Sequence, residues 1–250
     1  MDGLDDSANY IVRVAPINNI GSGTYVSQSS SRNPAEANDP DFAKAIVYTH
    51  LDSGVAGLDD LSSTSATVSS GIVSANAGHT LDGKFSESIR LTEEDFIKYT
   101  FTAVPNVSGV TAECFWKPNG TVSVVDKRPI FRITDGTKDY ITLSYDGSAS
   151  QGYRFLVHDS GNVQILSTTS QSISDFTHLA VVRDSGLAPT TNAFHKVSLF
   201  VDGKQLDTGR SEGNYTITDF VLSSGTAGAN PDFNIDEARL STIVRYSGVF

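Results

Sequence analysis

The chain has 250 residues and a formal net charge of −11, and its 13 Phe, 9 Tyr and many Val and Ile can fill a sizeable core. The charge is spread along the chain without a cluster of Lys or Arg, which argues against binding to a nucleic-acid backbone. Cys114 is the only cysteine, which excludes an intramolecular disulfide framework and a four-cysteine zinc site.

Residues 1–42 are rich in Ser, Asn, Gly and Pro and predict an extended N-terminal arm. Within the arm, the segment YIVRVAPI places Tyr10, Val12 and Val14 on one face, so it can add to a sheet edge of its own domain or of a neighbouring subunit. A flexible leader with one anchored strand is the equal alternative. The chain starts without the basic and apolar regions of a secretory signal, and no apolar run approaches the roughly 20 residues that cross a bilayer. We expect no membrane insertion.

Polar residues dominate 57–71, GLDDLSSTSATVSSG, which predicts a long surface loop. From 110 to 201, apolar and polar side chains alternate with the period of two that is typical of strands. In Thr111–Lys117, one face carries Ala112, Cys114 and Trp116 and the other carries Glu113, Phe115 and Lys117.

Gly-bearing turns separate the predicted strands. Asp202-Gly203 is the strongest hairpin signal, because a tight turn needs residues that accept a positive φ. The other predicted turns are Asn119-Gly120, Asp135-Gly136, Asp146-Gly147 and Ser160-Gly161-Asn162. No segment predicts a helix. Many short strands joined by turns predict an all-β fold in residues 43–250, a two-sheet antiparallel jelly-roll sandwich.

Six segments in a fixed order resemble the laminin-G-like domains of the concanavalin A-like lectin/glucanase superfamily. They are IVYTHLDSG, LDGKFSESIRL, TAECFWKP, ISDFTHLAVVRDSG, VSLFVDGKQLDTG and NIDEARLSTIVRYSGVF, and together they span about residues 44–250. Two details depart from the family pattern: Trp116 stands one place late, and Phe176-Thr177 replaces a Trp-His pair. The closing RYSGVF, with Arg245, Tyr246 and Phe250, resembles domains of bacteriophage virion proteins. The resemblance implies a jelly roll and recognition of sugars or proteins, but no particular chemistry.

An enzyme is not expected. Glycosidases of this superfamily carry E-x-D-x-E or E-x-D-x-x-E on one strand, whereas Glu93-Glu94-Asp95 is followed by Phe96, Ile97 and Lys98. The five histidines have no nucleophile motif beside them. No cofactor is expected. Calcium remains an alternative without assigned residues, since Asp and Asn are common in the turns but no EF-hand pattern occurs.

Adjacent carboxylates at Asp236 and Glu237 interrupt the closing strand. Phe233 and Ile235 have one parity and Ala238 and Leu240 the other, so a β-bulge at Asp236-Glu237 is predicted, with Glu237 and Arg239 close enough on the outward face to form an ion pair. These residues are therefore interpreted as structural rather than catalytic.

Two functions compete. The first is a bacteriophage virion structural protein, a capsid decoration, head fibre or tail-associated protein, assembled in the host cytoplasm. Its arm would contact other virion proteins, and its copies would form a homo-oligomer, with a trimer favoured. The alternative is a carbohydrate-binding adhesion module, for which Trp116, Tyr140, Tyr145 and Tyr153 are candidate sugar contacts, although core packing is the favoured reading of each. A glycoside hydrolase comes third.

Overall fold

A computed structural model gives the fold of the chain. It describes residues 41–51, 58, 60–62, 66–71, 78–85, 87–92, 95–107, 109–119, 128–148, 152–159, 163–168, 172–184, 194–212, 215–223 and 232–246, together with four two-residue strands nearer the N-terminus. The chain divides into two compact units, Met1–Ala43 and Lys44–Phe250. No helix among the described residues is long and apolar enough to span a bilayer.

The first unit contains short antiparallel pairs. β1 (Arg13–Val14) pairs with β4 (Val26–Ser27), and β2 (Ile17–Asn18) pairs with β3 (Gly21–Ser22). Val14, from the predicted strand of the arm, thus pairs within its own unit. Tyr10 and Val12 lie outside the described residues.

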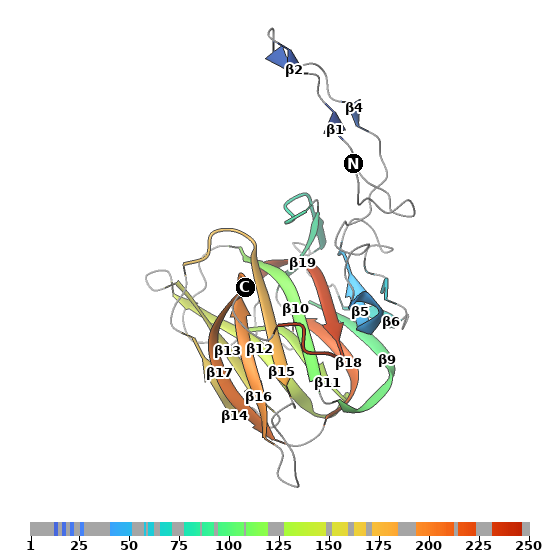
Figure 1. Cartoon of the computed structure of the whole chain (residues 1–250), viewed down its shortest axis with the longest axis vertical. Coiled ribbons are helices and arrows are strands. Elements are labelled where there is room, and N and C mark those ends of the chain that lie inside the picture. The colour runs from blue at the N-terminus through green and yellow to red at the C-terminus, as the bar shows by residue number, and fades with distance from the viewer. Residues whose placement is uncertain are drawn as a thin grey trace. The chain divides into compact units, whose positions relative to one another are not determined.

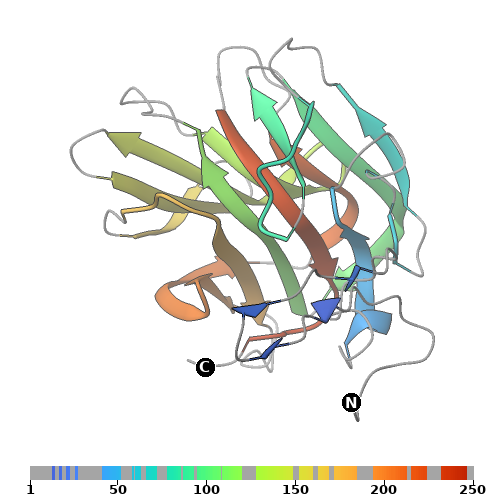
Figure 2. The same ribbon diagram turned by 90° about the horizontal axis from the view of Figure 1, so that it is seen from above.

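The second unit is a sandwich of two antiparallel sheets, which lie face to face in Figures 1 and 2. The eight-stranded sheet has the order β17-β16-β15-β10-β19-β8-β7, and β5 also pairs with β19. Its strands are β5 (Ala45–Thr49), β7 (Gly78–Thr80), β8 (Ser88–Thr92), β10 (Gly109–Pro118), β15 (Thr177–Asp184), β16 (Phe194–Val201), β17 (Lys204–Glu212) and β19 (Asp232–Ser241). A 3₁₀ turn, η1 (Phe42–Lys44), precedes β5.

The seven-stranded sheet has the order β14-β13-β12-β11-β18-β9-β6. Its strands are β6 (Thr67–Ser70), β9 (Phe96–Val107), β11 (Arg128–Thr134), β12 (Asp139–Ser148), β13 (Gly152–Asp159), β14 (Val163–Ser167) and β18 (Tyr215–Ser223). Strands far apart in sequence lie side by side at the centre of each sheet, such as β10 with β19 and β9 with β18, as in a jelly roll. The predicted all-β jelly-roll sandwich is confirmed.

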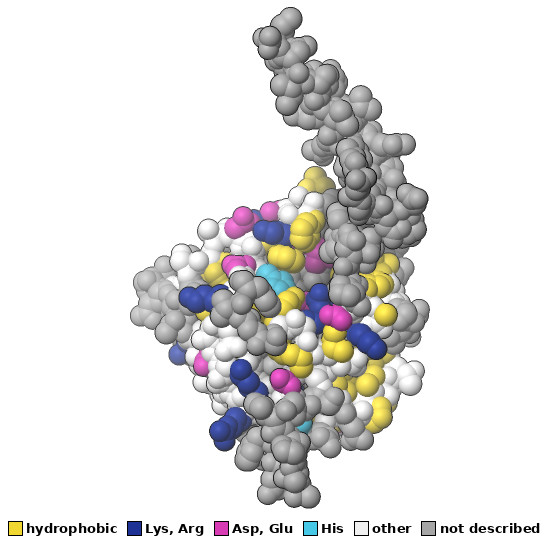
Figure 3. Space-filling view, in the orientation of Figure 1, with side chains coloured by type: hydrophobic (Ala, Val, Ile, Leu, Met, Phe, Trp, Pro, Cys, Tyr) yellow, Lys and Arg dark blue, Asp and Glu magenta, His cyan; other side chains and the backbone are white. Residues whose placement is uncertain are grey.

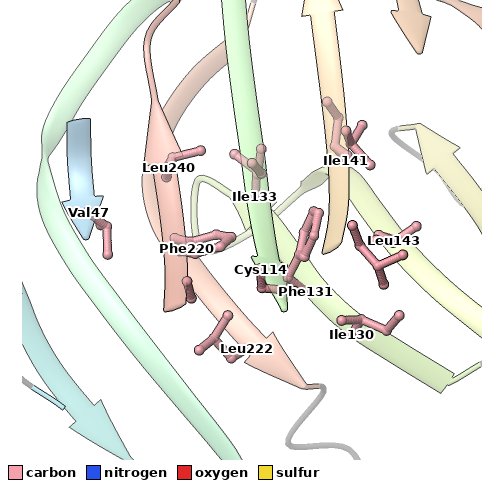
Figure 4. Close-up of a cluster of buried hydrophobic side chains, with 14 of the residues drawn as sticks. Val47, Cys114, Ile130, Phe131, Ile133, Ile141, Leu143, Phe220, Leu222 and Leu240 are labelled. Carbon is pink, nitrogen blue, oxygen red and sulfur yellow. The ribbon is translucent and has the colours of Figure 1, made fainter. Parts of the chain in front are cut away.

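Alternate side chains of both sheets form one core, part of which is shown in Figure 4. Cys114 and Trp116 point into it from β10, as their alternation predicts, and both are 0% exposed. The Trp116 ring lies 4.8 Å from that of Tyr145 and 5.5 Å from that of Phe155, so strands of both sheets meet at this side chain. Burial of these large apolar rings is the main force that holds the sheets together.

The turn predictions are partly confirmed. Asp202 and Gly203 form the hairpin between β16 and β17 with φ values of 48° and 74°. Two predictions are wrong. Asp146-Gly147 is not a turn, because β12 continues through both residues. The loop predicted over 57–71 contains the edge strand β6, whose side chains are exposed or half-buried, so their polar character gave no sign of a buried strand face.

Candidate functional site

A pocket of about 550 Å³ opens on the outer face of the seven-stranded sheet. It is lined by Lys98, Arg132, Thr134, Gly136, Thr137, Lys138, Asp139, Asp219 and Val221. Nearly all of these residues are charged or hydrogen-bonding, with Val221 as the apolar exception. The pocket therefore suits a polar ligand.

Strand register brings distant parts of the chain together at the pocket. Lys98 on β9 lies opposite Val221 on β18, and Val221 lies opposite Arg132 on β11. Two residues along β18, Asp219 lies opposite Thr134 of β11. On each strand, the residues between these paired positions point into the core. The side chains of the paired residues therefore point to the outer face of the sheet. The floor of the pocket is thus a regular three-stranded surface.

A rigid turn forms one wall. The Oδ1 atom of Asp135 accepts hydrogen bonds from the backbone N–H groups of Thr137 and Lys138, at 2.8 and 2.7 Å, and from the Thr137 hydroxyl at 2.7 Å. The Tyr140 hydroxyl donates to the other oxygen at 2.8 Å. The hydrogen bonds from Thr137 are the largest cause that lowers the pKa of Asp135 below its ordinary value. The ionised carboxylate holds the turn, and with it Lys138, in one conformation.

The turn also approaches the floor closely. Gly136 has φ of 86°, in the left-handed region, and a Cβ atom at this position would lie 3.4 Å from Oδ2 of Asp219. Asp219 is 5% exposed, and its carboxylate accepts hydrogen bonds from the hydroxyls of Thr100 at 2.6 Å and Thr218 at 2.8 Å. Glycine therefore gives the turn its conformation, while a Cβ atom here would make only an ordinary contact with this carboxylate.

The charges in the pocket are unequally paired. The Nζ atom of Lys98 lies 3.7 Å from Oδ1 of Asp219, and Nη1 of Arg132 lies 3.2 Å from Oδ2 of Asp139. The ammonium of Lys138 lies 5.5 Å from the centre of the Tyr140 ring, and within the described part of the chain Lys138 forms no ion pair. Three cations and two carboxylates thus line the pocket, and the ionised carboxylate of Asp135 lies in the turn that forms its wall, whereas acidic residues outnumber basic ones in the chain as a whole.

Most of the aromatic residues predicted to contact sugar lie in the core. Trp116 and Tyr145 are 0% exposed, which confirms core packing, the favoured reading of both, and contradicts the alternative of sugar contact. Tyr140 is 8% exposed and stacks on Tyr215, with 4.5 Å between ring centres. Tyr153 is half-buried at 5.4 Å from the Trp116 ring. These rings are buried because side chains alternate between the two faces of a strand, and theirs face the opposite sheet. Among the described residues, no aromatic ring lines the pocket.

The bulge predicted in β19 is present. Glu113 pairs with Arg239 and Phe115 pairs with Asp236, so the single residue Cys114 lies opposite both Glu237 and Ala238. Glu237 adopts a φ of 50°, as a residue of a bulge can. The extra residue accounts for the change of parity along the strand.

Asp236 and Glu237 hold neighbouring segments onto the outer face of the eight-stranded sheet. Oδ2 of Asp236 accepts hydrogen bonds from the backbone N–H groups of Lys84 at 2.8 Å and Phe85 at 3.2 Å. Glu237 accepts a hydrogen bond from the Tyr48 hydroxyl at 2.7 Å, and its other oxygen lies 2.6 Å from Nδ1 of His50. These contacts give Asp236 and Glu237 structural roles.

Arg239 lies on the same outer face and is 5% exposed. Its Nε donates a hydrogen bond to the Ser241 hydroxyl at 2.9 Å. The ion pair of Arg239 with Glu237 stays a prediction.

Catalytic chemistry finds no support in the E-x-D segment. Asp95 is 0% exposed, and its Oδ2 accepts hydrogen bonds from the backbone N–H and hydroxyl of Thr92 at 2.9 and 3.1 Å, so it binds to the end of β8. Glu93 and Glu94 lie outside the described residues. No group of three or more His, Cys, Asp and Glu side chains that could hold a metal occurs in the described segments, and the calcium alternative stays without a site.

On the outer face of the eight-stranded sheet, basic and acidic side chains are interspersed over the coloured part of the surface in Figure 3. The surface in this view shows no continuous basic area of the kind that binds a phosphate backbone.

Together, the two antiparallel sheets define a jelly-roll sandwich domain with a polar pocket on one outer face. Residues 91–246 match the family model of the concanavalin A-like lectin/glucanases superfamily, and the chain belongs to this family. A sequence comparison with curated proteins gives no match.

Solved structures with a similar fold include receptor-binding domains of botulinum neurotoxins. The type G domain has a TM-score of 0.58 at 10% identity, covering 80% of this chain and 48% of that one. A type C structure, described as showing that cell entry depends on two ganglioside molecules, has a TM-score of 0.57 at 12% identity, with coverage of 82% and 49%. A type DC binding domain in complex with SialylT has 0.58 at 11%, with coverage of 81% and 48%. The chain spans about half the length of these structures, and at these identities the likeness shows the fold alone.

Proposed function

We propose that the protein is a carbohydrate-binding domain that holds a saccharide in the pocket on the outer face of the seven-stranded sheet. The observation that carries this proposal is the pocket itself, whose lining of charged and hydroxyl side chains matches the hydrogen-bonding groups of a sugar. Membership of a lectin-containing family is in keeping with this function, although the family also holds proteins with other activities.

Each part of the pocket offers a group that a sugar can use. Arg132 and Lys138 donate hydrogen bonds, and Asp139 accepts them. The Thr134 hydroxyl, which accepts from the Gly136 N–H at 2.9 Å, can donate to a sugar, and the Thr137 hydroxyl, which donates to Asp135, can accept from one. The turn that carries Thr137 and Lys138 is already fixed by Asp135, so little conformational entropy is lost when a ligand binds. Binding without catalysis requires nothing more than these groups.

The structural neighbours agree with a role in recognition. Their descriptions name ganglioside molecules, SialylT and, for a further DC binding domain, rat synaptotagmin II. These ligands support recognition of glycans or proteins by this fold. They assign no ligand to the pocket, because this chain spans only about half of each neighbour.

A glycan array followed by calorimetry tests the proposal. The full chain is screened, and each glycan found is titrated against wild-type protein and against Arg132→Gln, with Arg154→Gln as the matched control, because Arg154 pairs with Asp146 on the exposed side of the same sheet. We expect Arg132→Gln to weaken binding about tenfold, corresponding to one charge-assisted hydrogen bond, and the control to leave it unchanged. Silence across a broad array, or equal effects of the two variants, would refute a saccharide site in this pocket.

A second proposal concerns the biological setting, which is display on a bacteriophage particle. Its support is the tail segment around Arg245 and Tyr246, which resembles domains of virion proteins, and the separate N-terminal unit Met1–Ala43. In this setting the arm binds other virion proteins, the copies form a homo-oligomer, and the sandwich is displayed for attachment. Deleting residues 1–40 should abolish incorporation into particles while the sandwich stays folded. Normal incorporation of the deleted chain would contradict the role of the arm.

A further inference from the structure

We propose that the pocket selects an acidic saccharide, placing a carboxylate or sulfate group of the sugar between Lys98 and Lys138. This inference rests on the proposed function and specifies the class of ligand. It follows from the exposed ammonium of Lys138, which pairs with no carboxylate among the described residues, from the position of Lys98 and from the way in which the carboxylates beneath them are already engaged.

Lys138 is the cation best placed to meet an anion. It is exposed at the rim, and its backbone N–H donates to Asp135 at 2.7 Å, so the turn fixes the point from which its side chain extends. Its ammonium lies 5.5 Å from the centre of the Tyr140 ring and, within the described part of the chain, pairs with no carboxylate. An exposed ammonium without a counter-ion gains most from an anionic ligand, since no existing ion pair must be broken.

Lys98 forms the other side. Its side chain is 41% exposed, and its ammonium lies 3.7 Å from Oδ1 of Asp219, near the upper limit for an ion pair. That oxygen already accepts a shorter hydrogen bond of 2.6 Å from Thr100. The lysine can therefore turn toward a ligand while the hydroxyl groups continue to stabilise Asp219.

The buried carboxylate beneath does not reverse this preference. Asp219 is 5% exposed and its two oxygens accept hydrogen bonds from Thr100 and Thr218, so a ligand meets mainly the cations and hydroxyls above it. Asp139 is 37% exposed and pairs with Arg132 at 3.2 Å, which leaves it available to accept a hydrogen bond from a sugar hydroxyl. The pocket thus offers cations for an acidic group and acceptors for the ring hydroxyls.

Matched ligands separate charge from sugar recognition. Oligogalacturonate is compared with its methyl-esterified form, which keeps the ring and hydroxyls but loses the carboxylate charge, and a sulfated dextran oligomer is compared with plain dextran oligomer. We expect the acidic member of at least one pair to bind about tenfold more tightly than its neutral partner, and the difference to shrink as salt rises from about 0.05 to 0.5 M. The two pairs tell carboxylate from sulfate.

The variants Lys138→Gln and Lys98→Gln locate the effect, with Lys204→Gln as a control that removes the same charge from an exposed position in the eight-stranded sheet. Each pocket variant should lower affinity for the acidic ligand about fivefold to tenfold and leave the neutral one unchanged, whereas the control should do neither. If acidic and neutral ligands bind equally, or if Lys204→Gln has the same effect as the pocket variants, the inference fails. The proposed function still holds in that case if Arg132→Gln abolishes binding of the neutral ligand. Absence of binding by every ligand refutes both.

Discussion

The carboxylate of Glu113, on β10, accepts a hydrogen bond from Nη1 of Arg245 in the segment that follows β19. The Tyr246 hydroxyl donates to the second oxygen of the same carboxylate, and Nε2 of His178 lies 3.2 Å from it. Glu113 is only 4% exposed. A buried carboxylate on the sheet thus holds Arg245 and Tyr246, two of the three residues that carry the tail motif, while Phe250 lies outside the described residues.

Apolar contacts extend this attachment. Val244 and Tyr246 pack on a small cluster of Ala180, Val182 and Phe200 on the outer face of the eight-stranded sheet. The segment can be followed in Figure 1 as the dark red trace that crosses β10 and β15 after β19. The tail is therefore a strap across the sheet, held by both charge and burial.

Replacement of Glu113 by Gln should release this strap. The change leaves the Arg245 guanidinium with a weaker, neutral partner, and disruption of a buried pair costs about 3 kcal/mol of folding free energy. We expect urea unfolding to show this loss and trypsin to cleave after Arg245 much faster than in the wild type. Asp146→Asn, which alters the exposed pair with Arg154, should change stability by less than about 1 kcal/mol and leave cleavage unchanged. Slow cleavage at Arg245 in Glu113→Gln would show that the apolar contacts alone hold the tail.

The contacts around Glu113 also predict that stability depends on pH, through His178. Burial lowers the pKa of His178 to about 4, and the nearby Asp202 opposes this only in part. In the unfolded chain the group titrates near pH ~6.5. Between these values the unfolded state binds more protons, so stability is highest above pH ~6.5 and falls as the pH drops toward about 4.

The loss should be about 1 to 3 kcal/mol between pH 7 and pH 4.5, the lower value applying if the adjacent Glu113 carboxylate favours the charged ring. Urea unfolding at the two pH values measures it, and His178→Gln should remove most of the difference. His79→Gln is the control, because His79 is exposed on β7. An NMR titration that placed the pKa of His178 near 6.5 would contradict the prediction.

Local patterns in the sequence predict the strands and the bulge well. Alternation assigns Cys114 and Trp116 to one face of β10 and Glu113 to the other, and the parity change at Asp236-Glu237 coincides with the bulge. The same alternation predicts that Tyr145 points toward the core from its strand, and its ring lies there.

The pocket was not predicted, because its residues come together only through long-range pairing. Lys98, Arg132 and Asp219 belong to three strands whose order and register depend on how the whole sandwich closes. Each residue alone looks like an ordinary outward-facing side chain. The one local signal was Asp135-Gly136, which marks the turn but not the strands over which it folds.

Gly136→Ala should weaken both the turn and the binding of ligand. A side chain at a φ of 86° is strained, which costs about 1 to 2 kcal/mol, and relief of this strain would shift the turn that carries Thr137 and Lys138. We expect a comparable loss of stability in Gly203→Ala, at the β16–β17 hairpin, but reduced saccharide affinity only in Gly136→Ala. Unfolding curves and titrations of both variants provide the comparison. Equal affinities would mean that the shape of this turn does not matter to the pocket.

Gly209→Ala should separate the two sheets at their common edge. Gly209 lies on β17 of the eight-stranded sheet, and a Cβ atom there would lie 2.3 Å from the carbonyl oxygen of Ile165 on β14 of the seven-stranded sheet. The neighbour is backbone, so it cannot move aside as a flexible side chain would, and forcing an extra methyl group into such a contact costs about 1 to 3 kcal/mol. Urea unfolding should show this loss in Gly209→Ala, whereas Thr208→Ala, an exposed position one residue earlier, should change stability by less than about 0.5 kcal/mol. If Gly209→Ala is as stable as the wild type, β14 and β17 can move apart without cost, and the close contact of these two edge strands does not stabilise the sandwich.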